Sequence, residues 1–240
     1  MTVQELSNQF DALISSYKRF KDFDAKEELD SFEFNEYEKS IFLTNAQEEL
    51  ILSLYNGRNP SLQSFEETEE LRRYLSNLIE EVELSPIETV SGKPLGMESN
   101  SKFFTLPENL WFITYEKALC SNETCKMKAS QDVYPVRQYE YNRVKKNPFR
   151  GANERRALRL DLSEGNVEII SKFGVTSYYV RYIRKVKPII LEDLPNNLEI
   201  RGVSTISECE LHEALHQIIL KLAVQMALQS KGIKVNNENK

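Results

Sequence analysis

Apolar residues repeat with helical spacing near both ends of this chain and with strand spacing in its middle. The clearest helical stretch runs from Ser207 to about Ser230 and ends before Gly232. In the middle, Leu158 and Leu160 alternate with polar residues, and turn residues follow at 163–166. This order predicts an α+β fold, in which a helical, bundle-like N-terminal region and a long C-terminal helix surround an antiparallel β meander.

Two more helices are predicted before the strands. Thr44–Gln47 has the pattern of a capping box, for a helix that ends at Asn56–Gly57. A second helix is predicted over 64–83, capped by Ser64 and favoured by glutamates in its first turn. Residues 85–106 are expected to form a loop, and four segments are expected to form strands: 110–119, 158–162, 167–170 and 177–190.

These elements suggest a simple domain organisation. We expect an N-terminal helix and extended arm over 1–36, a single α+β structural domain over 37–232, and a polar tail over 233–240. A chain of 240 residues can bury a core without help from disulfides or a metal.

Composition excludes several classes of protein. No apolar run approaches the roughly 20 residues that cross a bilayer, and the first ten residues lack the pattern of a signal peptide. The cysteines, Cys120, Cys125 and Cys209, are odd in number, which favours a reducing compartment. The sequence assigns no role to any of the three. We therefore expect synthesis in a cytoplasm and no contact with a membrane.

Charge is distributed unevenly along the chain. Residues 1–90 carry 20 acids and 8 bases, within a total net charge of −6. A basic run follows, and it is the candidate assembly or DNA-channel patch: Arg137, Arg143, Lys145, Lys146, Arg150, Arg155, Arg156 and Arg159. Acidic and basic flanks could register neighbouring copies, or they could simply be solvated faces. Interleaved aromatic residues also leave open a cytoplasmic nucleic-acid-binding module.

A zinc-hydrolase pattern is the one motif that suggests catalysis. His212-Glu213-Ala214-Leu215-His216 matches H-E-x-x-H, in which both histidines bind zinc and the glutamate acts as a base. A catalytic zinc needs a third protein ligand, and the residues after His216 offer only Glu238 as an acid. The zinc-dependent metallohydrolase is therefore the alternative, and the sequence favours no enzyme, no cofactor and no metal.

Three segments, in this order, resemble motifs of virion ring proteins from crAss-like phages of Bacteroides. They are Tyr37–Gln47, then Glu140–Arg143 with Asn147–Arg150, then Cys209–Leu211 with Leu215 and His216. The resemblance covers residues 1–230. It implies a structural ring, or head-to-tail connector, in the virion, stacked between portal and tail around the DNA. The implied partners are copies of itself in a ring of twelve, the portal, neighbouring tail rings and packaged DNA. No catalytic residue is carried over.

Overall fold

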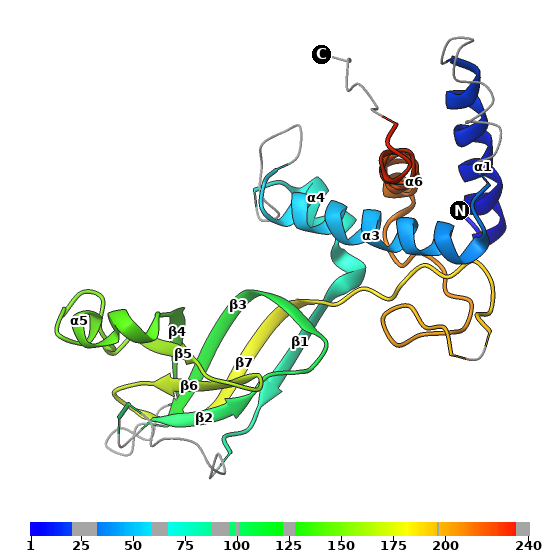
Figure 1. Cartoon of the computed structure of the whole chain (residues 1–240). Coiled ribbons are helices and arrows are strands. Elements are labelled where there is room, and N and C mark those ends of the chain that lie inside the picture. Colours follow the sequence, from blue (N-terminus) through cyan, green and yellow to red (C-terminus); the bar gives the residue numbers. More distant parts are fainter. Residues whose placement is uncertain are drawn as a thin grey trace. The chain divides into compact units, whose positions relative to one another are not determined.

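The computed structural model describes residues 1–20, 33–58, 67–87, 97–98, 101–121, 128–195 and 197–233. The chain divides into two compact units (Figure 1): Met1–Leu78 with Val186–Lys240 form unit 1, and Ile79–Lys185 form unit 2. The α+β fold class is confirmed. A single domain over 37–232 stays a prediction, and most of the expected arm and tail lie outside the described residues.

Unit 1 contains the helices α1 (Val3–Phe20), α3 (Glu36–Tyr55), α4 (Glu69–Tyr74) and α6 (Glu213–Ser230), with the short 3₁₀ helix η2 (Ser76–Leu78). Helix α6 packs against both α1 and α3. Fully buried apolar side chains form the contacts, among them Phe10, Leu43 and Ile219, each 0% exposed. Within the described residues, no helix has the length and apolar character needed to span a membrane.

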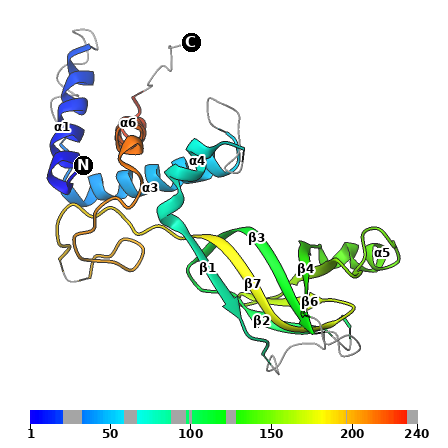
Figure 2. The same ribbon diagram turned by 180° about the vertical axis from the view of Figure 1, so that it is seen from behind.

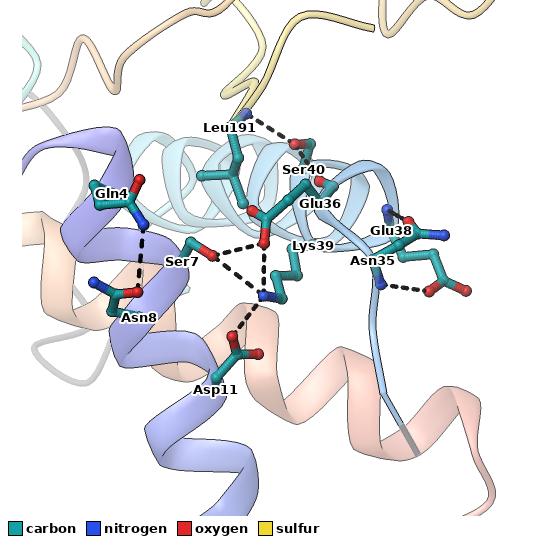
Figure 3. A network of polar contacts seen from close by, with 10 residues as sticks. All are labelled: Gln4, Ser7, Asn8, Asp11, Asn35, Glu36, Glu38, Lys39, Ser40 and Leu191. Carbon is teal, nitrogen blue, oxygen red and sulfur yellow. Dashed lines mark hydrogen bonds and ion pairs between the residues drawn. The ribbon is translucent and has the colours of Figure 1, made fainter. Parts of the chain in front are cut away.

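A buried lysine joins α1 to α3. The Lys39 ammonium lies 2.7 Å from Asp11 and 2.9 Å from Glu36, and it also donates to the Ser7 hydroxyl (Figure 3). Burial lowers the pKa of Lys39, but the hydrogen bonds to the two carboxylates outweigh it, and the net pKa is raised. A charged lysine can therefore remain in this interior because its partners replace the water it has lost.

Helix α3 begins nine residues earlier than the sequence pattern predicts. Asn35 is its N-cap, and a capping box joins the Asn35 side chain to the Glu38 amide and the Glu38 side chain to the Asn35 amide. The predicted capping box at Thr44–Gln47 is wrong, because these residues lie inside the helix. The predicted end is confirmed, since Asn56 is the C-cap and Gly57 has a φ of +68°.

Polar side chains on one face of α3 instead hold the segment 187–191 by its backbone. Ser40 accepts from the Leu191 amide, Thr44 exchanges hydrogen bonds with Ile189, and the Gln47 side-chain amide donates to the Lys187 carbonyl. Four helical residues rise about 6 Å and two extended residues about 6.6 Å, so the two repeats match. This ladder satisfies buried backbone groups that belong to no sheet.

Unit 2 is a curled, mixed sheet with the strand order β1-β7-β3-β4-β5-β6-β2 (Figure 2). The strands are β1 (Ile79–Leu84), β2 (Lys102–Thr105), β3 (Leu110–Ser121), β4 (Lys128–Pro135), β5 (Arg156–Asp161), β6 (Asn166–Ile170) and β7 (Gly174–Arg184). A bridge between Ile87 and Phe103 links the ends of the curl. The sheet is not purely antiparallel, because β4 and β5 are parallel.

Four further predicted boundaries were wrong, and one of them is the strand expected over 177–190, which runs from Gly174 to Arg184. Residues 79–83 belong to strand β1 rather than to a helix, because the glutamates of this segment meet partners on β7, as Glu80 does with Arg184 at 3.2 Å. Residues 102–105 form β2 rather than loop. The last helix begins at Glu213 rather than at Ser207, which pairs with Ile190 in a bridge. The predicted cap Ser64 lies outside the described residues.

Candidate assembly surface

Most of the predicted basic patch lies on one excursion of unit 2, between β4 and β5. Because these strands are parallel, the chain must cross over between them, and it does so through η3 (Gln138–Glu140) and α5 (Tyr141–Lys145). Tyr141, 2% exposed, packs the excursion onto Leu158, Leu160 and Ile170. Both views show α5 projecting beyond the strands (Figure 1 and Figure 2).

Glu98 also anchors this excursion, through contacts with two of its side chains. The Tyr141 hydroxyl donates to the Glu98 carboxylate at 2.6 Å, and the Lys145 ammonium pairs with the same oxygen. The hydrogen bonds from Lys145 and Tyr141 lower the pKa of Glu98. Burial, followed by the bond to Glu98, raises the pKa of Tyr141. The excursion is thus anchored by an apolar cluster and by two polar contacts to Glu98.

The structure brings six of the eight predicted basic residues to the exposed surface of this excursion. They are Arg137, Arg143, Lys145, Lys146, Arg150 and Arg155. Arg143 pairs with Glu140 at 3.1 Å, with its side chain 78% exposed, so this pair contributes little stability. The six bases therefore form a solvent-facing positive surface.

Arg156 and Arg159 are placed differently. The Arg156 guanidinium lies 4.1 Å from the centre of the Tyr134 ring and donates to the Phe149 carbonyl. Arg159 turns into the curl, where its guanidinium pairs with Glu116; these side chains are 11% and 8% exposed. The Tyr178 hydroxyl also donates to Glu116 at 2.5 Å. Arg159 is thus an internal residue of unit 2.

In this internal cluster, burial disfavours the charged form of Glu116. Burial therefore raises the pKa of Glu116, while the neighbouring Arg159 guanidinium lowers it. Burial, and then the Glu116 carboxylate, raises the pKa of Tyr178. The arginine is therefore what allows a carboxylate to lie among apolar strands.

The two histidines of the zinc-hydrolase pattern have separate roles. His212 is the N-cap of α6, with an extended backbone (φ −58°, ψ 140°), and its ring accepts from the Ala214 amide. His216 lies inside the helix, 5% exposed, with its Nε2 3.0 Å from the Leu211 carbonyl. Because His212 lies outside the helix proper, the shared helical face that the motif requires is lost. Among the described residues, no cluster of three potential ligands is arranged to hold a metal.

His216 should make unit 1 sensitive to mild acid. Burial lowers its pKa below the ordinary value of 6.5, although the hydrogen bond to Leu211 opposes this. The unfolded chain therefore takes up the proton first, so stability is full above pH 6.5 and falls as the pH drops toward the lower folded pKa. Urea unfolding followed by circular dichroism should show a falling midpoint between pH 7.5 and 5.5.

His216→Gln is the matched variant for this measurement. It should flatten the pH dependence whatever its effect on the absolute midpoint, because the titrating group is gone. Equal slopes for the variant and the original chain would contradict the assignment.

Each of the two described cysteines donates a hydrogen bond to a glutamine of its own unit. Cys120 is buried and donates to the Gln131 side chain, and Cys209 donates to the Gln47 side chain. Burial raises the pKa of both thiols, that of Cys209 to about 11, so both are poor nucleophiles at neutral pH. Cys125 lies outside the described residues.

The two units of the structure differ in net charge. Unit 1 contains 23 acidic and 14 basic residues, whereas unit 2 contains 14 acidic and 17 basic residues. The chain thus has one acidic and one mildly basic unit, and six exposed bases of unit 2 lie on the α5 excursion.

Comparison with known proteins adds an identity to this geometry. The model of the family described as "Phage tail ring protein 3/4" matches residues 1–239. The chain belongs to this phage tail ring family. "Ring protein 3" of Bacteroides phage crAss001 is 47% identical over 241 residues, covering 99% of this chain and 100% of that protein. "Ring protein 4/5" of the same phage is 31% identical over 236 residues, covering 95% and 92%.

The tail ring family confirms the resemblance found in the three sequence motifs. The structure assigns roles to several residues of these motifs. Tyr37–Gln47 contains the cap-proximal turn and the polar ladder of α3, and Asn147–Arg150 forms the exposed turn of the excursion. Some of the matched residues in both segments bond to the backbone or shape a turn, whereas others, such as Leu43, are buried in the core.

Proposed function

We propose that this tail ring protein is a non-enzymatic structural subunit that closes with copies of itself into a ring between portal and tail. The division of charge between the two units carries this proposal within the family assignment. A ring requires a heterologous interface, in which one surface of each copy meets a different surface of the next. An acidic unit and a basic excursion on one chain supply two such surfaces.

Opposite charges would chiefly affect how fast two copies meet and in which orientation they bind. Complementary potentials steer association and penalise wrong pairings, whereas apolar contacts supply most of the affinity. Ring closure should therefore slow as salt rises. Twelve copies, stacked on the portal and on neighbouring tail rings, complete the proposal.

The ring would surround DNA as it passes between head and tail. A net charge of −6 favours a conduit that does not hold the duplex tightly. The exposed bases of the α5 excursion support a second candidate, direct binding of nucleic acid. A steep loss of DNA affinity with salt, shown by the unassembled chain, would favour that candidate.

Labelling of intact particles tests the location. Gold-labelled antibodies against this protein, applied to disrupted and intact virions, should mark a single position where the tail meets the head. Label on the capsid faces or at the tail tip, or no protein in purified particles, would overturn the proposal.

A further inference from the structure

The tip of the excursion presents an aromatic side chain to solvent. Phe149 is 84% exposed, more than any other large hydrophobic residue among those described. Two bases of the same segment, Lys146 and Arg150, are exposed beside it in the sequence. Aromatic and arginine side chains are the groups that most often dominate binding energy when they become buried at an interface.

The turn that carries Phe149 is held rigidly. The Asn147 side chain accepts from the amides of Phe149 (2.9 Å) and Arg150 (3.2 Å), and Arg156 donates to the Phe149 carbonyl (2.9 Å). Gly151 donates to the Asn147 carbonyl, and a Cβ at Gly151 would lie 2.9 Å from that oxygen. A rigid aromatic tip loses little conformational freedom on binding.

Unit 1 has a cavity whose chemistry complements this tip. The cavity, of about 560 Å³, is lined by Glu69, Glu70, Arg73, Tyr74 and His212. The Tyr74 and His212 rings lie 5.7 Å apart and offer aromatic surface to a third ring. Glu69 pairs with Arg73 at 2.7 Å and Glu70 accepts from the Tyr74 hydroxyl, and both carboxylates stay exposed to basic side chains of a docking copy.

We propose that Phe149 of one copy packs against the Tyr74 and His212 rings of the next, with Lys146 and Arg150 facing Glu69 and Glu70. This contact rests on the proposed ring, to which it assigns the two surfaces that meet. It also accounts for the pattern of charge, because the aromatic tip belongs to the basic unit and the cavity to the acidic one.

The exposed phenylalanine favours a protein partner over DNA. A ring can enter a DNA duplex only by wedging between two base pairs, which costs the energy of unstacking them, and phosphate contacts need only basic side chains. Burial against the two aromatic rings of the cavity carries no such cost.

Two single variants test the contact. Phe149→Ala removes the aromatic tip, and Glu70→Lys reverses a charge at the cavity and removes the hydrogen bond from Tyr74. Both side chains are exposed, so the melting temperature of each unit should change only slightly. Each variant should weaken association between copies by roughly 30-fold or more, as measured by native mass spectrometry across a concentration series. Ile206→Ala, which removes another exposed apolar side chain, is the matched control and should assemble normally.

Mixing the two variants makes the test specific. In a one-to-one mixture, the intact tip of the Glu70→Lys chain meets the intact cavity of the Phe149→Ala chain, so dimers should form and growth should stop there. A Phe149→Ala chain that assembles normally, or that loses only DNA affinity, would overturn the contact and leave the ring standing. An original chain that stays monomeric at every concentration would instead overturn the ring itself.

Discussion

Arg159→Leu should lower the free energy of unfolding of unit 2 by about 3–5 kcal/mol. The substitution leaves the Glu116 carboxylate, 8% exposed, without its cationic partner inside the curl. The Tyr178 hydroxyl remains as a donor, but a single neutral hydrogen bond does not replace a guanidinium. Trp111, the only tryptophan of the chain, lies on β3, so its fluorescence in a urea titration reports on this unit.

Two controls separate charge from size. Arg155→Leu removes an exposed base from the same segment and should leave the midpoint unchanged. The double variant Arg159→Leu with Glu116→Leu should recover most of the loss, because a buried ion pair replaced on both sides leaves no unpaired charge. A loss below about 1 kcal/mol for Arg159→Leu alone would mean that water reaches Glu116.

Thr44→Val combined with Gln47→Leu should lower the free energy of unfolding of unit 1 by about 2–4 kcal/mol. These changes keep the size of the side chains but leave the Ile189 amide and carbonyl and the Lys187 carbonyl without partners. Thr44 and Gln47 are 1% and 0% exposed, so water cannot take their place. Hydrogen exchange measured by NMR should show lost protection first at the Ile189 amide.

Asn45→Ala is the matched control on the same turn of α3. Its side chain is exposed and takes no part in the ladder, so stability should change only slightly. Unaltered exchange at Ile189 in the double variant would show that segment 187–191 is held by packing alone.

Local sequence patterns predicted the elements whose signals are local. The turn at 163–166 is confirmed, with Glu164 and Gly165 at φ values of 58° and 71°, as a tight hairpin requires. The end of α3 at Asn56–Gly57 is also confirmed. At each of these positions, the residues that decide the conformation are neighbours in the sequence.

Elements whose partners are distant could not be predicted in this way. The helical spacing of apolar residues such as Leu75, Leu78 and Val82 favoured a helix that continues to 83, but residues 79–83 pair with β7, about 100 residues later. Thr44 and Gln47 had the spacing of a cap, and their actual partners lie more than 100 residues away. In both places, tertiary hydrogen bonds outweigh local preference.

The sequence showed that basic residues cluster in this segment, but not which of their side chains face solvent. Arg159 was grouped with the basic run, yet alternation along β5 places it on the face of Ala157, which lines the core inside the curl. Both faces of β5 are covered, because the Tyr141 cluster packs on Leu158 and Leu160. In the sequence, Phe149 is only one of the aromatic residues interleaved with the basic run, since exposure and turn rigidity are not visible in a sequence.

Native mass spectrometry of the purified protein, with electron microscopy of the same sample, tests whether copies of this chain close into a ring. We expect one discrete multimer, seen end-on as closed rings, whose formation slows as salt rises. A monomer at all concentrations, or open filaments of variable length, would contradict it.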